Sequence, residues 1–134
     1  MNVIIDAYNI AGWFGYFEFL KEGKITLREV RKKVFKDILE NPLLSLRDRR
    51  IKVDLIFDSG GEKRLKKLER REIQGIKIIF SRRKETADDF IWRNAEKGDA
   101  VVVTEDNELR KRLEEKGVQV CDPEFFFGDK NQKN

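Results

Sequence analysis

Short apolar runs recur along the chain, separated by segments whose apolar residues repeat at helical spacing. The first run, Val3-Ile4-Ile5, is apolar at successive positions, which is typical of a strand buried on both faces of a parallel sheet. Later runs share this character, although the second begins with an alternation of apolar and polar residues. The pattern predicts strands at residues 2–6, 51–57, 76–80, 100–104 and 118–121.

Helical patterns fill the intervals between these strands. Thr26, followed three residues later by Glu29, forms a capping box that begins a helix, and Asn41-Pro42 ends it. Alternating strands and helices predict an α/β fold, a three-layer αβα domain with a mostly parallel five-stranded sheet. The remaining expectations are a partly helical aromatic segment at 10–20, a loop or short turn at 43–46, and helices at 85–98 and 107–116.

Two segments do not fit the alternation. Residues 62–72 are intensely charged and carry only a thin apolar stripe, so we interpret them as a helix or an ordered arm on the surface. Phe125-Phe126-Phe127 is an apolar patch that we expect to close over the core. Residues 128–134 are polar and are expected to form a disordered tail. We therefore expect one domain, residues 1–127, followed by that tail.

The composition limits the chemistry. The 134 residues include no histidine and one cysteine, Cys121, with a net charge of +4. Without histidine, Ser-His-Asp, Cys-His and His-assisted RNA cleavage are excluded, as is an ordinary zinc site. A metal would be held by oxygen ligands, which favours Mg²⁺ or Mn²⁺. The lone cysteine fits a reducing cytoplasm, and no apolar run is long enough for a membrane helix.

Acidic residues follow several of the predicted strands. In a parallel sheet the carboxyl ends of the strands share one edge, so these acids should lie together. Several carboxylates at one place repel one another unless a cation lies among them, which predicts a divalent metal site. The candidates are Asp6, Asp58, Asp88, Asp89, Glu105 and Asp106.

Each acid also has an ordinary structural explanation. Asp6 and Asp106 are plausible helix caps, Asp58 precedes a Ser-Gly-Gly turn, and acids in a first helical turn favour the helix dipole. Helical phase separates the adjacent pair: at about 100° per residue, Asp88 should point toward the site and Asp89 away from it. Asp89 is therefore expected as a supporting residue or a cap.

Basic residues also follow strand ends at the same edge. They suit a nucleic acid whose phosphates are held outside an acidic centre, although a single charged run is usually a solvated surface. The candidate nucleic-acid-binding residues are Lys63, Arg64, Lys67, Arg71, Arg82, Arg83 and Lys84.

Four short motifs resemble one family. The opening V-I-I-D-A-Y-N-I resembles the first motif of NYN domains, a branch of the PIN-like (Rossmannoid) nucleases, and I-F-D at 56–58 fits their second strand. T-A-D-D-F-I at 86–91 resembles the YacP-like subgroup. V-T-E-D at 103–106 is similar to its V-T-S-D motif, with Glu105 replacing serine. The resemblance extends from Asn2 to about Phe127.

This resemblance implies a metal-dependent endoribonuclease acting on ribosome-associated mRNA or structured RNA. Carried over by position, Asp6, Asp88 and Asp106 would be the catalytic, metal-binding acids, supported by Asn9, Asp58, Asp89 and Thr104. Glu105 either adds a ligand or points to solvent. One or two Mg²⁺ or Mn²⁺ ions would assist hydrolysis to a 5′-phosphate and a 3′-hydroxyl.

Other readings remain open. The alternative function is a non-catalytic RNA- or ribosome-binding module on the same fold. A phosphoacceptor receiver domain fits poorly, because Asp6 stands alone after the first strand, and the last strand ends in Cys121-Asp122 where a receiver would have a lysine. The sequence is compatible with a monomer or a homodimer, and does not distinguish RNA from DNA.

Overall fold

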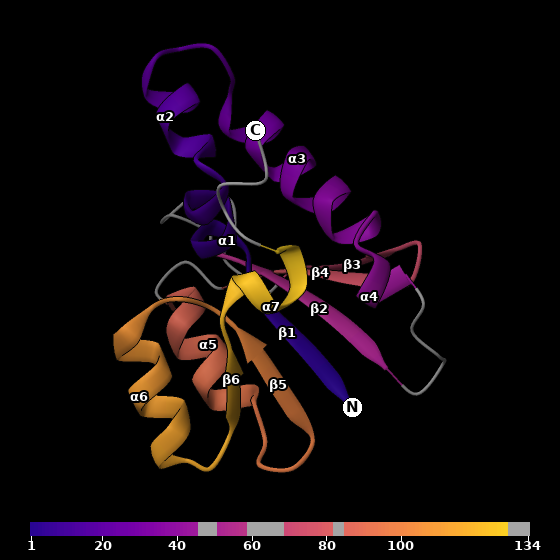
Figure 1. Ribbon diagram of the computed structural model, residues 1–134, viewed down its shortest axis with the longest axis vertical. Helices are drawn as coiled ribbons and strands as arrows, with labels where there is room; N and C mark the ends of the chain where they lie inside the picture. The colour runs from indigo at the N-terminus through magenta and orange to yellow at the C-terminus, as the bar shows by residue number, and fades with distance from the viewer. Residues whose placement is uncertain (46–50, 59–68, 82–84, 129–134) are drawn as a thin grey trace.

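The computed structural model describes residues 1–45, 51–58, 69–81 and 85–128. Within them one six-stranded sheet has the order β3-β4-β2-β1-β5-β6 (Figure 1). Neighbours are parallel except at one edge, where β3 runs antiparallel to β4. The strands are β1 (Asn2–Asp6), β2 (Lys52–Phe57), β3 (Glu69–Ile73), β4 (Ile76–Phe80), β5 (Ala100–Val103) and β6 (Gln119–Cys121).

Helices cover both faces of this sheet, which confirms the three-layer αβα architecture. α1, α3 and α7 pack on one face with Val3, Ile5 and Leu55, while α5 and α6 pack on the other with Ile4 and Val102. The helices are α1 (Ala7–Phe14), α2 (Tyr16–Lys21), α3 (Leu27–Leu39), α4 (Pro42–Ser45), α5 (Ala87–Asn94), α6 (Asn107–Glu115) and α7 (Pro123–Phe127). None of the described helices is long and apolar enough to cross a membrane.

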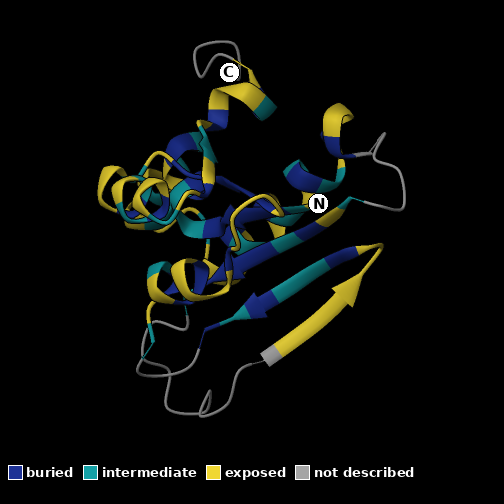
Figure 2. Ribbon diagram, turned by 90° about the horizontal axis from the view of Figure 1, so that it is seen from below, coloured by how far each residue is buried: buried dark blue, intermediate teal, exposed yellow. Residues whose placement is uncertain are grey.

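The strand β3 corrects the interpretation of residues 69–72, whereas residues 62–68 of the same segment lie outside the described residues. Residues 69–73 form neither a helix nor a surface arm, but a sixth, edge strand of the sheet (Figure 2). Gln74 and Gly75, both at positive φ, make the tight turn that folds it back on β4. A charged edge strand needs little apolar surface and resists pairing with other chains, which explains the thin apolar stripe.

Several local predictions are confirmed. Thr26 and Glu29 form the capping box of α3. The aromatic segment at 10–20 is helical, and Gly15, at φ 83°, divides it between α1 and α2. The C-terminal apolar patch closes over the core only in part: Phe127 is buried against Trp13, whereas Phe125 is 66% exposed. Residues 129–134, where a disordered tail is expected, lie outside the described residues.

Candidate active site

A pocket of ≈ 250 Å³ opens at the carboxyl edge of the sheet. β1 ends there in Asp6, β2 leads to Asp58, and α5 and α6 begin beside them. The chain order of a parallel sheet therefore brings residues far apart in sequence to one place. The pocket is lined by Asp6, Tyr8, Asn9, Asp58, Ala87, Asp88 and Asp106.

Asp6 is the buried centre of this pocket, with 5% of its surface exposed. The Thr104 hydroxyl, wholly buried after β5, donates a hydrogen bond of 3.1 Å to its Oδ2. Burial, and then the negative charges of Asp88, Asp106 and Asp58, raise the pKa of Asp6 from 3.8 to about 7, while the Thr104 bond opposes the rise. The charged carboxylate is thus costly in the absence of a cation.

Asp88 lies in the first turn of α5 and is half-buried. Burial, followed by the charge of Asp106 and a hydrogen bond with it, raises the pKa of Asp88 to about 6. Arg112 opposes this rise. Asp88 and Asp106 are therefore close enough to interact directly, and Asp88 would ionise more readily beside a cation.

Asp106 is both a helix cap and a pocket residue. Its Oδ1 accepts hydrogen bonds from the backbone amides of Glu108 and Leu109, at 2.9 and 3.2 Å, and so caps α6. Its own amide donates to Thr104 Oγ1 at 3.1 Å. Asp106 therefore caps α6 and lines the pocket at the same time, although the sequence presents these two roles as alternatives.

Asp58 and Asn9 tie neighbouring elements to the pocket. Asp58 Oδ2 accepts a hydrogen bond of 3.2 Å from the amide of Ala87, the first residue of α5. Asn9 Oδ1, in α1, accepts one of 2.8 Å from the amide of Glu105. Both contacts fix the segments that carry Asp88 and Asp106.

Two of the acidic candidates from the sequence do not line the pocket. The Asp89 carboxylate pairs with Arg112 at 3.0 Å, and its amide is held by the Thr86 hydroxyl. Asp88 and Asp89 are thus placed as helical phase predicts. Glu105 is exposed and contributes its amide, not its carboxylate, to the contact with Asn9.

Tyr8 is a pocket residue that sequence reasoning missed. Its hydroxyl accepts a hydrogen bond of 2.8 Å from Arg31 Nε of α3, and its ring meets Phe57 edge to face. Its position two residues after the end of β1 indicates that it lies near the pocket, since the sequence predicts the site at that edge of the sheet. Among the basic candidates, only Arg71 is described, exposed on β3; Lys63, Arg64, Lys67, Arg82, Arg83 and Lys84 lie outside the described residues.

The donor set suits a hard cation. The side chains of Asp6, Asp58, Asp88 and Asp106 offer oxygen alone. The raised pKa values of Asp6 and Asp88 indicate that the negative charges of these two side chains need compensation. Among the described residues no three acidic or cysteine side chains are preassembled to hold a metal. Mg²⁺ usually keeps several waters and uses one or two carboxylates, so the residues present fit such an ion.

The chain matches a family model and a solved structure. Residues 3–132 match the model of the YacP-like NYN domain. No curated protein matches. The crystal structure of the W164L mutant of Rae1 (YacP) from Bacillus subtilis is similar, with a TM-score of 0.62 and 19% identity over 91% of this chain and 69% of that one. At that identity the likeness is one of fold. Because the family model spans nearly the whole sequence, the chain belongs to the YacP-like NYN domain family of PIN-like nucleases.

Proposed function

We propose that the protein is an endoribonuclease that uses Mg²⁺ or Mn²⁺ to hydrolyse phosphodiester bonds. The observation that carries this proposal is the buried Asp6 carboxyl, whose pKa is raised to about 7 by burial and by the acids around it. A stably folded protein retains such a cluster at a cost to its stability, and a bound divalent ion removes that cost. Membership of a nuclease family supports the same reaction.

The residues of the pocket would divide the work. Asp6, Asp88 and Asp106 would hold the ion, while Thr104, Asn9 and Asp58 position them. A bound ion would lower the pKa of a water molecule and would neutralise charge on the phosphate. Addition of water across the P–O3′ bond places the hydroxyl on phosphorus and the proton on the 3′-oxygen. The products are a 5′-phosphate and a 3′-hydroxyl.

RNA is the proposed substrate class, either mRNA on the ribosome or structured RNA. The absence of histidine from the sequence favours metal-assisted hydrolysis over cleavage through a 2′,3′-cyclic phosphate. The single cysteine supports a cytoplasmic location. Whether the protein works as a monomer or a homodimer is tested by its mass in solution.

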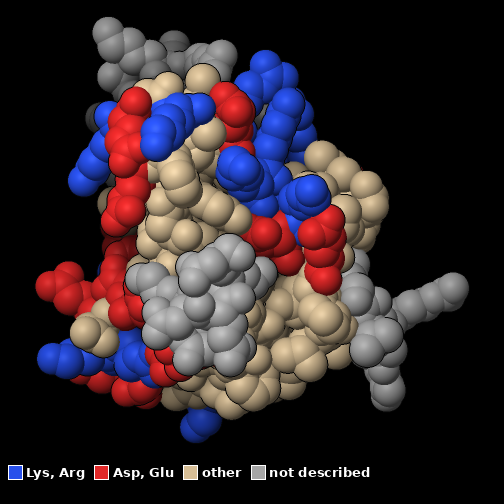
Figure 3. Space-filling model, turned by 45° about the horizontal axis from the view of Figure 1, so that its top comes forward, with Lys and Arg blue, Asp and Glu red and all other residues tan. Residues whose placement is uncertain are grey.

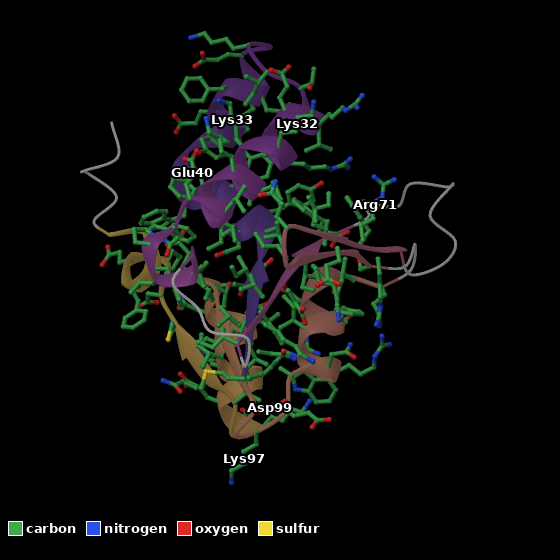
Figure 4. The ribbon with its side chains drawn as sticks, turned by 90° about the vertical axis from the view of Figure 1, so that its right-hand side faces the viewer. Lys32, Lys33, Glu40, Arg71, Lys97 and Asp99 are labelled. Carbon is green, nitrogen blue, oxygen red and sulfur yellow. The ribbon has the colours of Figure 1, made fainter. Side chains whose placement is uncertain are left out.

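The test compares the protein with an Asp6→Asn, Asp88→Asn double variant on labelled single-stranded and structured RNA in Mn²⁺. We expect EDTA to abolish cleavage and the variant to lose about 100-fold or more in rate. Asp99→Asn is a matched control, because Asp99 is exposed and lies at the end of the molecule opposite α3 (Figure 4). Equal cleavage by the double variant and the control would overturn the assignment.

A non-catalytic RNA-binding module is the second candidate. It is favoured by the lack of three preassembled metal ligands among the described residues. A binding module needs no metal, so Mn²⁺ would leave its thermal unfolding unchanged. The proposed nuclease should instead be stabilised by Mn²⁺, and the double variant should not.

A further inference from the structure

The helix α3 divides its charges between two flanks. Val30, Val34 and Ile38 are buried and mark the side that faces the core. At about 100° per residue, Asp37 and Glu40 fall on one flank of that buried side, together with Lys33. The charges of the other flank and of the outward side are mostly basic, and Glu29 lies beside Lys36 at their border. The basic charges come from Arg28, Arg31, Lys32 and Lys36, which we call the α3 basic face.

This run of like charges is unfavourable for the isolated helix. Arg28 and Lys32, and then Lys32 and Lys36, are like-charged pairs one turn apart, which repel. Within the described residues Arg28 and Lys32 are exposed and make no ion pair, while Lys36 pairs weakly with Glu40 at 3.9 Å. Figure 3 shows lysine and arginine side chains gathered over α3. An anionic ligand would relieve this repulsion.

Arg31 connects the α3 basic face to the candidate active site. Its guanidinium lies 5.2 Å from the ring centre of Phe80, the last residue of β4, and its Nε donates to the hydroxyl of Tyr8. Tyr8 lines the pocket that contains Asp6. The basic face therefore continues through one direct contact into the pocket.

The neighbouring edge of the sheet extends the same surface. Arg71 of β3 pairs with Ile78 of β4, whose side chain packs on the α3 side of the sheet. Opposed residues of an antiparallel pair share a face, so Arg71 lies on the α3 side too. Figure 4 shows Lys32 and Arg71 toward one side of the molecule, with Lys33 and Glu40 toward the other.

We propose that the α3 basic face, with Arg71, binds the phosphates of a single-stranded RNA on one side of the bond to be cut. This inference rests on the proposed function, because it leads the strand into the pocket of Asp6. Arg28, Lys32 and Lys36 follow one another one turn apart along α3, a row that would follow successive phosphates. Phosphate contacts position a strand without reading its sequence. The surface thus selects a chain of phosphodiesters rather than a mononucleotide.

The first test measures binding without cleavage. The Kd of a 12-nucleotide RNA is measured by fluorescence anisotropy in EDTA over a range of salt concentrations. We expect an Arg28→Gln, Lys32→Gln double variant to bind about tenfold more weakly, with a salt slope smaller by about 1.4. Both residues are exposed and glutamine is a good helix former, so the fold should be retained.

The matched control removes the same charge elsewhere. Lys33→Gln, Lys97→Gln takes one cation from the other flank of α3 and one from the far end of the molecule (Figure 4). We expect its Kd to change by less than about twofold. If both double variants bind the RNA equally more weakly, the effect is one of net charge alone. If neither variant binds the RNA more weakly, RNA does not bind to this surface. Competition by polyglutamate as strong as that by RNA would indicate an acidic protein partner instead.

Cleavage separates this inference from the proposed function. With Mn²⁺ present, the Arg28→Gln, Lys32→Gln variant should raise KM for the 12-nucleotide RNA and leave kcat and the cleavage of a trinucleotide unchanged. Metal-dependent cleavage with an unaltered KM would overturn the binding surface but keep the nuclease. Weakened RNA binding without any metal-dependent cleavage by the unmodified protein would overturn the nuclease but keep the surface.

Discussion

Thr104 and Asp6, 98 residues apart in sequence, are joined by a hydrogen bond of 3.1 Å beneath the candidate active site. Both side chains are buried, and the same Thr104 oxygen accepts a hydrogen bond from the backbone amide of Asp106. One hydroxyl thus supports two of the proposed metal ligands, by donating to one and accepting from the other. This relationship makes the site a property of β1 and β5 together.

Replacing Thr104 with valine should remove this support at nearly constant volume. The Asp6 carboxyl would lose its buried hydrogen-bond donor, and the Asp106 amide would lose its acceptor. We therefore expect the free energy of unfolding to fall by about 1–3 kcal/mol. The pKa of Asp6 should rise further, because the Thr104 bond opposes its increase. Urea unfolding checks the stability, and Thr104→Ser, which keeps the hydroxyl, should recover most of it.

Asp6→Asn should be more stable than the original protein in EDTA, by an amount that depends on pH. The folded-state pKa of Asp6 is about 7 against an ordinary 3.8, so the folded state retains the proton longer than the unfolded state. The contribution of Asp6 to stability is fully present below about pH 4 and is lost as pH rises to about 7, a loss of up to about 4 kcal/mol.

Asparagine does not titrate, so the gap in unfolding free energy between Asp6→Asn and the original protein should widen as pH rises from about 4 to about 7. Chemical unfolding at a series of pH values measures it. At pH 7.5, Mn²⁺ should narrow the gap by stabilising only the protein that retains Asp6. A gap that is independent of pH would contradict the raised pKa.

Asp106 should allow its capping role and its role in the pocket to be separated. Asparagine caps a helix about as well as aspartate, so Asp106→Asn should keep the stability of α6, whereas Asp106→Ala should cost about 1 kcal/mol. Both should impair metal-dependent cleavage. Loss of the Asp106 charge should also lower the pKa of Asp88 toward its ordinary value, which carboxyl ¹³C NMR can follow. If Asp106→Asn cleaved RNA at the rate of the original protein, Asp106 would act only as the cap of α6.

Asn9→Ala tests the tie between α1 and the segment before α6. The Glu105 amide would lose its acceptor, but it lies at the surface and water replaces part of the bond. We therefore expect a loss of about 0.5–1.5 kcal/mol in unfolding free energy and a larger relative loss of cleavage rate. Glu105→Gln is the control: its side chain does not line the pocket, so cleavage should be retained. Strong loss in that control would place the Glu105 carboxylate in the site.

Much of the architecture follows from local pattern. The apolar run before Asp6 and the capping box at Thr26 and Glu29 depend on neighbours in sequence, and both are found as expected. Parallel strands bring their carboxyl ends to one edge, so the sequence was sufficient to gather Asp6, Asp58 and Asp106 there. Helical phase likewise separated Asp88 from Asp89.

Contacts between distant segments needed the tertiary structure. The edge strand β3 could not be distinguished from a charged helix by its periodicity, because the Gln74-Gly75 turn and its pairing with β4 decide its conformation. Which acids enter the pocket also depends on packing, since the Asp89 side chain reaches Arg112 while Glu105 stays at the surface. The sequence by itself determined the edge of the sheet at which the candidate pocket lies. Only the packing of the layers decided that Asp6 is buried on Thr104 and that Tyr8 connects the pocket to Arg31, because both contacts join elements that are distant along the chain.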